Sequence, residues 1–297
     1  MGTSRKKFRG LFNRYHKNMP YSEMVTKDID YLFLACYHWF KNGFKSKTIL
    51  VYPHYPSRRS TIYLLAKQLN YNVTNRPNKK FDFAIYWEYL TFRKEFEYLE
   101  SVARHKKVIN LYSRDISKKT VDQAVQSIFD YSTFINPLLY KGKIVKKNDI
   151  NAIHDGTILN SPVDKKEDGY IYQILINNTT DDGMVVDIRV PIIFGTLSFV
   201  YEKFKPVDDR FGHPDRSFVR DIHDLLTGEE INSINRLCEH MKLEFGEMDV
   251  LRDRKNGKIY VIDVNNTPQF QSKLSPSDRN YALQKMATEL EKNIHIQ

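Results

Sequence analysis

Residues 248–268, with the sequence MDVLRDRKNGKIYVIDVNNTP, contain the feature that most restricts the fold of this chain. Asn256 and Gly257 stand between two runs of apolar residues, and an Asn-Gly pair in this setting is a strong signal for a β-hairpin. Apolar residues occur on both faces of the two predicted strands: Met248, Val250, Leu251, Ile259, Val261, Ile262 and Val264. We therefore expect a hairpin that is largely buried on both sides.

The length of the hairpin loop decides which acidic side chains face one another. Successive side chains point to opposite faces of a strand, so a shift of one residue moves a side chain to the other face. A two-residue loop would place Asp249 opposite Val264, and Asp263 would then lie on the other face. A three-residue loop over 255–257, with Gly257 left-handed in a bulge, places Asp249 opposite Asp263. We predict the three-residue loop.

The same register brings Glu247 opposite Asn265, so that four oxygen-bearing side chains share one face. Carboxylates buried in this way cost several kcal/mol unless they are paired or bound to a cation. Clustered Asp and Asn oxygens suit Mg²⁺, whose coordination is commonly completed by water and by substrate phosphates. The alternative is a surface hairpin whose acids are solvated or form ion pairs with Arg252 and Lys258.

The predicted secondary structure differs before and after residue 141. Strands are expected at 48–52, 81–87 and 107–111, with helices at 28–44, 57–69 and 118–130. Strands alternating with helices predict a small parallel α/β domain. The later part is β-rich, with strands expected at 142–147, 156–159, 169–176, 184–194 and 197–204 and helices at 217–226, 229–242 and 278–293.

Local signals refine these helices. The helix at 28–44 carries apolar residues at helical spacing, so we expect it to lie in the core and to bury the Cys36 thiol. Ser117 is the expected N-cap of the next long helix. Thr227 with Glu230 forms a predicted capping box. Cys238 lies far from Cys36 in sequence, which favours two buried thiols over a disulfide or a zinc site.

Composition limits the classes of function. The 297 residues are 41% hydrophobic, which is enough for a sizeable core, and no run reaches the roughly 18 apolar residues of a membrane span. The net charge of +10 favours an anionic partner such as a nucleotide, an acidic substrate, a nucleic acid or a membrane surface. The dense basic run at 4–17 is interpreted as a solvated arm rather than a nucleic-acid site. We expect a soluble, cytoplasmic protein.

The strand Tyr260-Val261-Ile262-Asp263-Val264-Asn265, preceded by Asp249 and followed by a proline, resembles the metal-binding signature of ATP-grasp enzymes. The resemblance covers roughly residues 110–295 and implies that Asp249, Asp263 and Asn265 bind two Mg²⁺ ions, replaceable by Mn²⁺, that bridge the phosphates of ATP. It also implies an α/β (α+β) fold in which two β-rich subdomains sandwich ATP behind a small leading parallel α/β domain.

Two further motifs resemble the amino-acid ligase branch of that family, which includes glutathione synthetase and the ribosomal-protein glutamate ligase. The first implies an adenine-binding hinge at Gln173, Ile174, Leu175 and Ile176. The second set consists of Asp187, which is assigned to nucleotide binding, and the cations Arg189, Lys203 and Arg210, which are assigned to charge stabilisation at the transferred phosphate. As isolated residues, these cations are equally typical of solvated strand edges.

Two lysines complete the implied nucleotide site. Lys147 matches the lysine that binds the ATP phosphates, with Lys146 as its competitor because strand alternation points only one of the pair inward. Lys118 is a second candidate, although a solvent-facing helix lysine is the simpler interpretation. The usual glycine-rich phosphate loop is replaced by residues 148–156, with a single glycine, where His154 is either a phosphate ligand, a base or a structural histidine.

The resemblance implies the following organisation and activity. Residues 1–27 form a basic arm, 28–115 the leading domain, and 116–297 the ATP-grasp region, with a middle subdomain at about 137–180 and a C-terminal subdomain at about 181–297. The implied reaction joins an acid, expected to be anionic, to an amine through an acyl phosphate. The alternatives are a kinase acting on a hydroxyl group, a non-catalytic ATP-binding protein and a nucleic-acid-binding protein, of which the last two are disfavoured. A homodimer is possible.

Overall fold

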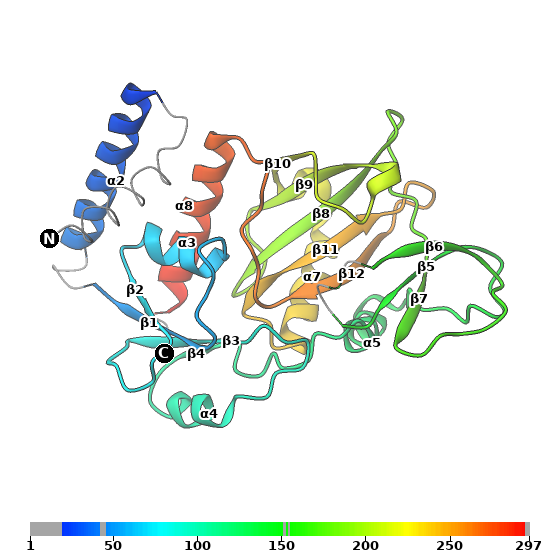
Figure 1. Cartoon of the computed structure of the whole chain (residues 1–297), viewed down its shortest axis with the longest axis horizontal. Helices are drawn as coiled ribbons and strands as arrows, with labels where there is room; N and C mark the ends of the chain where they lie inside the picture. Colours follow the sequence, from blue (N-terminus) through cyan, green and yellow to red (C-terminus); the bar gives the residue numbers. More distant parts are fainter. Residues whose placement is uncertain (1–19, 42–45, 151–152, 154, 295–297) are drawn as a thin grey trace, which may run out of the picture.

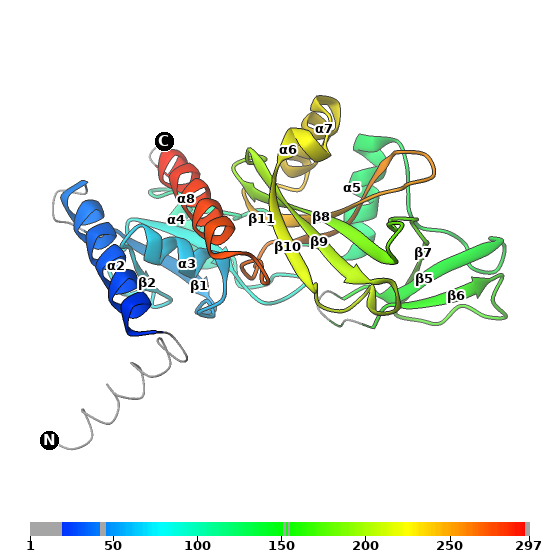
Figure 2. The same ribbon diagram turned by 90° about the horizontal axis from the view of Figure 1, so that it is seen from above.

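The computed structural model describes residues 20–41, 46–150, 153 and 155–294. Most of the predicted basic arm and His154 therefore lie outside the described residues. The chain forms three sheets that follow one another along the molecule, from the parallel sheet at one end to a small antiparallel sheet at the other (Figures 1 and 2). This arrangement agrees with the predicted mixed α/β class.

The leading sheet is parallel throughout. Its strand order is β2-β1-β3-β4, formed by β2 (Asn72–Thr74), β1 (Thr48–Pro53), β3 (Phe83–Trp87) and β4 (Val108–Ile109). Alternate residues of β1 and β3 pack on opposite faces. One face lies against α3 (Thr61–Gln68) and α8 (Pro276–Asn293), and the other lies against α4 (Glu97–Ala103). The predicted parallel α/β domain is confirmed, although β2 and α4 were not predicted.

The central sheet is antiparallel and has the order β10-β9-β8-β11-β12. Its strands are β8 (Met184–Ile193), β9 (Phe199–Pro206), β10 (Arg216–Asp221), β11 (Phe245–Arg252) and β12 (Ile259–Asn265), and a 3-10 turn, η1 (Val207–Asp209), follows β9. One face packs against α5 (Lys118–Phe129), α6 (Ile222–Leu225) and α7 (Gly228–His240) in an apolar core. The polar side chains of β8, β9, β11 and β12 gather on the opposite face.

The small sheet lies beyond β12 at the end of the molecule farthest from the leading sheet (Figures 1 and 2). It is formed by β6 (Thr157–Ser161), β5 (Gly142–Asn148) and β7 (Tyr170–Ile174), with antiparallel pairing on both sides of β5. The predicted strands at 142–147, 156–159 and 169–176 correspond to these three elements. Two antiparallel sheets therefore meet near the predicted acidic hairpin.

Side-chain capping defines the helices that support the central sheet. The Ser117 hydroxyl accepts a hydrogen bond from the Thr120 amide at the start of α5. At the start of α7, both hydrogen bonds of the predicted capping box between Thr227 and Glu230 are present. Each cap satisfies amides that have no partner within the helix. These predicted helix starts are confirmed.

The predicted helix at 217–226 is wrong over its first half. Residues there form β10, which pairs with β9 in the register Ser217↔Lys203, and only α6 is helical. Edge pairing with β9 satisfies the backbone of this segment, and the Asp221 side chain then caps α6 by accepting from the His223 amide. Tertiary pairing has overridden a local helical pattern.

The predicted core helix is also wrong in its burial. Residues 21–41 form α2 (Tyr21–Lys41), yet large apolar side chains such as Leu32 and Phe33 are exposed, as is Cys36. Cys238 is buried, as predicted. None of the described helices is long and apolar enough to cross a membrane.

Candidate functional site

The hairpin of β11 and β12 has the predicted pairing. Asp249 lies opposite Asp263, and Glu247 lies opposite Asn265. On the other edge of β11, Asp249 is opposite Arg189 of β8, so a cation lies beside the two facing acids. The central sheet therefore collects the predicted acids of the hairpin on one face.

The loop of the hairpin differs from the predicted three-residue loop, although the register around Asp249 is the predicted one. The Gly257 amide, at a left-handed φ of +72°, donates to the carbonyl of Asp253 and closes a loop one residue longer than expected. The pairing then shifts by one residue next to Asp249, where Ile262 of β12 forms a bulge. A bulge adds one residue to a single strand, so it compensates the longer loop.

Both carboxylate oxygens of Asp249 accept hydrogen bonds from cationic side chains. Arg189 donates to it through two nitrogens, with Nε 2.9 Å from Oδ1 and Nη2 3.0 Å from Oδ2, and Lys203 Nζ lies 2.7 Å from Oδ1. Burial alone raises the pKa of Asp249, but Arg189 and Lys203 outweigh that effect and hold the pKa well below its usual range. Asp249 is therefore ionised and fully engaged within the protein.

The two cations are shifted in opposite directions. Burial lowers the pKa of Arg189, but Asp249 and Glu247 outweigh the burial and raise this pKa above its ordinary value. Burial and the neighbouring Arg189 lower the pKa of Lys203, although Asp249 opposes them. Arg189 also reaches Glu247, with Nη1 3.0 Å from Oε1. Arg189 is thus fixed between two carboxylates of β11.

Asp263, directly opposite, has the contrasting environment. Its Oδ1 atom is buried and has no hydrogen-bond partner. Burial raises the pKa of Asp263, and the charges of Lys118 and Lys147 oppose this rise without abolishing it. A buried carboxylate oxygen without a donor is costly, so this atom is suited to receive a cation.

The lysines beside Asp263 come from two different elements. Lys147 of β5 places Nζ 3.3 Å from the carbonyl of Ile262, the bulged residue, and burial lowers its pKa to about 8. Lys118, the first residue of α5, is buried and donates from Nζ to the carbonyl of Ile150 at 3.2 Å. The interpretation of Lys118 as a solvent-facing lysine is therefore wrong.

The choice between Lys146 and Lys147 is resolved by the alternation of side chains along β5. Lys146 forms an ion pair with Glu167, and its Nζ lies 4.1 Å from the ring centroid of Tyr170, on the opposite side of the strand. Lys147 instead faces the hairpin. Only Lys147 of this pair belongs to the candidate site.

Asn265 completes the acidic side of the hairpin. Its Oδ1 accepts from the Thr267 amide at 2.9 Å, and its Nδ2 lies 3.4 Å from Glu247 Oε1. Burial raises the pKa of Glu247 to about 7, against the opposing charge of Arg189. The amide oxygen of Asn265 is thus held by the turn that follows β12, two residues from the unpartnered oxygen of Asp263.

A cavity of about 50 Å³ lies between the small and central sheets. It is lined by the predicted hinge and by residues of both sheets: Thr133, Val145, Lys147, Gln173, Ile174, Leu175, Ile176, Arg210, Phe211, Leu251 and Ile262. The mixture of aliphatic walls and two cations suits a planar apolar group attached to an anion. The volume is much smaller than the roughly 300–1,000 Å³ of small-molecule pockets.

Half of the predicted hinge is already occupied by protein contacts. Gln173 Nε2 donates to Thr133 Oγ1 at 2.6 Å, and the Ile174 amide donates to the Thr133 carbonyl at 2.9 Å. Thr133 is itself held by Asp122, whose Oδ1 accepts from its amide and its hydroxyl. Leu175 and Ile176 also line the cavity. The support by Thr133 and Asp122 was not predicted from the sequence.

Asn178 lies between Arg210 and Asp187, and its Nδ2 donates to Asp187 Oδ1 at 3.1 Å. Arg210 lines the cavity and donates to Asn178 Oδ1 at 2.6 Å, and burial lowers its pKa. Asp187 does not line the cavity; its Oδ2 lies 2.6 Å from Lys205 Nζ and 3.8 Å from Lys203 Nζ. Asp187 is thus placed to hold the lysines of β9, whereas Arg210 is placed at the cavity.

Phe211 is a lining residue that the sequence did not single out. A Cβ atom added at Gly156 would lie 2.7 Å from the Phe211 ring, so glycine is required for the ring to pack against the segment before β6. Of the segment Arg210-Phe211-Gly212, only Arg210 was predicted to belong to the site. The single glycine of the 148–156 loop was the signal for this contact.

The oxygen atoms of the site suit a cation that also binds phosphate. Within the described residues, no three His, Cys, Asp or Glu side chains are gathered closely enough to hold a metal ion by themselves. The unpartnered Oδ1 of Asp263 beside Asn265 nevertheless fits Mg²⁺, which is commonly bound by one or two carboxylates together with substrate phosphates. The residues present fit a cation that arrives with a nucleotide.

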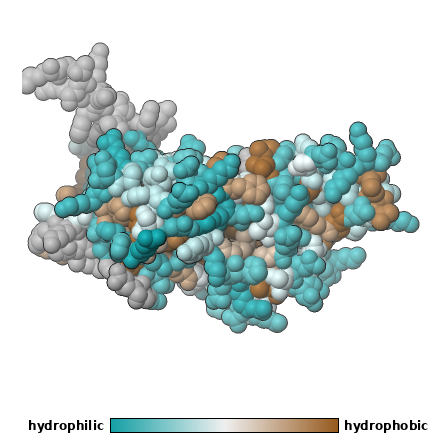
Figure 3. All heavy atoms as spheres, turned by 90° about the horizontal axis from the view of Figure 1, so that it is seen from below, coloured by the Kyte–Doolittle hydropathy of each residue, from teal (hydrophilic) through white to brown (hydrophobic). Residues whose placement is uncertain are grey.

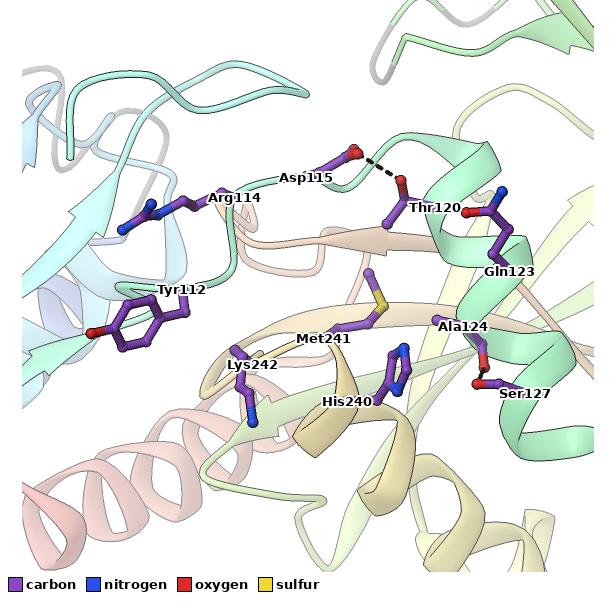
Figure 4. Close-up of a pocket in the computed structure, with 10 residues that line it drawn as sticks. All are labelled: Tyr112, Arg114, Asp115, Thr120, Gln123, Ala124, Ser127, His240, Met241 and Lys242. Carbon is purple, nitrogen blue, oxygen red and sulfur yellow. Dashed lines mark hydrogen bonds between the residues drawn. The ribbon is translucent and has the colours of Figure 1, made fainter.

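The larger cavity, of about 490 Å³, lies elsewhere. Figure 4 shows it between the segment after β4, the outer side of α5 and the end of α7, with Arg114, His240 and Lys242 among its lining side chains. Several of its polar groups already have partners, as in the hydrogen bond from Thr120 to Asp115. It contains none of the predicted site residues, so size alone does not locate the chemistry.

The architecture of two antiparallel sheets around a cation-lined cavity is similar to that of solved ATP-grasp ligase structures. No protein-family model matches the sequence, and no curated protein matches it. Solved structures do match the fold. The D-alanine–D-alanine ligase from Bacillus anthracis complexed with ATP is 14% identical, with a TM-score of 0.52, over 83% of this chain and 95% of that chain.

Two other ligase structures are similar. The ATP-grasp ligase PsnB, complexed with a precursor variant, Mg and ADP, is 11% identical with a TM-score of 0.54, over 84% of this chain and 98% of that chain. The VanG D-Ala:D-Ser ligase from Enterococcus faecalis is 14% identical with a TM-score of 0.51, over 73% of this chain and 74% of that chain. At this level of identity, the likeness establishes the fold.

Proposed function

We propose that this protein is an ATP-dependent ligase that joins a carboxylic acid to an amine. The observation that carries the proposal is the unpartnered, buried Oδ1 of Asp263, which lies beside Asn265 and near the charges of Lys147 and Lys118. This group combines a cation ligand with phosphate-binding cations at one end of an apolar cavity. Similar structures carry titles naming ligases, one with ATP and one with Mg and ADP.

The proposed binding mode assigns each residue a role. The adenine lies against the aliphatic walls, with backbone contacts from Leu175 and Ile176, which line the cavity. Lys147 binds the phosphates, assisted by Lys118. Asp263 and Asn265 hold Mg²⁺, which neutralises the phosphates when it is bound. Asp249 acts mainly by fixing Arg189 and Lys203, because all its oxygens are already engaged.

The proposed reaction has two steps. A carboxylate oxygen of the acid attacks the terminal phosphorus of ATP, and the bond to the bridging oxygen breaks with its electron pair going to ADP. The amine then attacks the acyl carbon, phosphate leaves with the electron pair of the broken C–O bond, and the amine loses a proton. Phosphoryl transfer requires positioning and charge neutralisation, which Arg189 and Lys203 supply from the central sheet and Arg210 from the segment after η1.

The test is a screen of acid and amine pairs for ADP release, with the mass of every product recorded. We expect at least one pair to give ADP, phosphate and an amide whose mass equals acid plus amine minus water. A phosphorylated hydroxyl compound formed with ADP would instead identify a kinase. ADP release that is independent of any acid, and identical in the Asp263→Asn variant, would overturn the assignment of the site.

A further inference from the structure

Helix α2 exposes more large hydrophobic side chains than any other described element. They are Tyr21, Val25, Ile29, Leu32, Phe33, Tyr37, Trp39 and Phe40, with Leu32 and Phe33 exposed by 63% and 73%. The face of the molecule seen in Figure 3 is largely hydrophilic, with hydrophobic patches between polar side chains. A concentration of apolar surface of this kind marks an interaction site.

The exposed apolar residues of α2 follow helical spacing. Val25, Ile29, Leu32 and Trp39 succeed one another by four, three and seven residues, and Phe33 and Phe40 extend the same side. Residues spaced in this way lie on one face of a helix. With 21 residues, α2 is about 31 Å long at ~1.5 Å per residue. The face is therefore a long apolar strip rich in aromatic residues.

Charge indicates what covers this strip. The sequence that leads into α2, residues 1–19, contains basic residues and no Asp or Glu: Arg5, Lys6, Lys7, Arg9, Arg14 and Lys17. Helix α2 itself adds little net charge, because two lysines stand against three acids: Lys27 and Lys41 against Glu23, Asp28 and Asp30. An acidic surface complements this basic sequence, whereas a second copy of the chain would bring the same positive charge.

We propose that α2 lies in the plane of an anionic membrane surface, with Val25, Ile29, Leu32, Phe33, Trp39 and Phe40 in the interface. Helices bind membranes in this way through an apolar, aromatic-containing face combined with basic residues that attract anionic lipids. In both views of the ribbon, α2 stands at the end of the molecule opposite the small sheet (Figures 1 and 2). Binding through α2 leaves the small sheet at the end of the molecule away from the lipid.

The two tryptophans of the chain allow a direct test. Trp39 on α2 is exposed, whereas Trp87 is fully buried in the leading sheet. We expect vesicles of phosphatidylcholine with phosphatidylserine to shift the tryptophan emission to the blue, and the Trp39→Phe variant to lose this shift while it still sediments with the vesicles. Pure phosphatidylcholine vesicles should bind at least tenfold less protein. Salt at about 1 M, where the screening length is ~3 Å, should release most of the bound protein.

A matched pair of variants separates the helix from general charge effects. Leu32→Glu with Phe33→Glu places two charges in the apolar strip and should lower vesicle binding more than tenfold. Gln284→Glu with Thr288→Glu places the same charge on exposed positions of α8 and should change binding less than threefold. Neither pair touches the nucleotide site, so nucleotide affinity should remain unchanged in both.

Two outcomes would overturn the proposal. The first is equal binding to neutral and anionic vesicles, or none to either. The second is a dimer in lipid-free solution whose mass and blue-shifted Trp39 emission depend on protein concentration and vanish in the Leu32→Glu, Phe33→Glu variant. The second result would assign the strip to a second copy of the chain.

Discussion

Asp249 and Asp263 lie directly opposite each other in one hairpin, yet their environments differ completely. Asp249 accepts three hydrogen bonds from Arg189 and Lys203, and its pKa is held well below the usual range despite burial. Asp263 has one buried oxygen without a partner, and burial raises its pKa. Hairpin register therefore brings two acids together, but the neighbouring strands decide what each acid can do. We infer a positioning role for Asp249 and a ligand role for Asp263.

The largest effect on ATP turnover is expected from substitution of Asp263. The Asp263→Asn variant should lose ATP turnover by at least about a hundredfold, because it removes the charged oxygen that we assign to the cation. Its thermal stability should be unchanged or higher, because a buried carboxylate with an unpartnered oxygen is replaced by a neutral amide. ADP release and thermal denaturation measured on one preparation test both statements. Normal turnover would remove Asp263 from the site.

At Asp249 we expect a loss of stability instead. The Asp249→Asn variant leaves Arg189 and Lys203 buried beside a neutral amide, and breaking a buried ion pair by removing one partner costs about 3–5 kcal/mol. Chemical denaturation should show this loss of unfolding free energy, with Asp263→Asn as the matched control. If the two variants were equally stable, the proposed difference between the two acids would be wrong.

The facing positions of Asp249 and Asp263 were predicted from the sequence, but the difference between their environments was not. Asp249 lies opposite Asp263 as predicted, but the predicted three-residue loop is wrong: the loop is one residue longer, and the bulge at Ile262 compensates for it in a way that residue types do not encode. The cations that distinguish the acids come from β8, β9, β5 and α5. Only tertiary packing determines which acid each cation reaches.

Helix prediction failed where local pattern and tertiary context disagreed. The segment that forms β10 has helical spacing, yet it pairs with β9 because the edge of the central sheet offers backbone partners. The apolar pattern of α2 was read as a core helix, but periodicity shows only that a helix has an apolar face and does not identify what covers it. The capped helices α5 and α7 were predicted well because their start signals are local.

The lysines of β5 provide a comparison between two faces of one strand. Lys147→Met should weaken binding of Mg-ADP by about ten- to a hundredfold, because it removes a buried cation that faces the hairpin. Lys146→Met is the control, because Lys146 pairs with Glu167 on the other side of β5. Titration calorimetry measures both affinities. Equal weakening in the two variants would contradict the assignment of Lys147.

The smallest effect is a pH dependence that also separates the two faces of β5. Burial lowers the pKa of Lys147 to about 8, so its side chain is charged below that pH and becomes neutral above it. A nucleotide bound by the charged form must recruit a proton at higher pH, so affinity for Mg-ADP should be constant below about pH 8 and fall by up to about tenfold per pH unit above it. The fall should be retained in Lys146→Met and absent in Lys147→Met. A fall that persists in Lys147→Met would show that another group titrates.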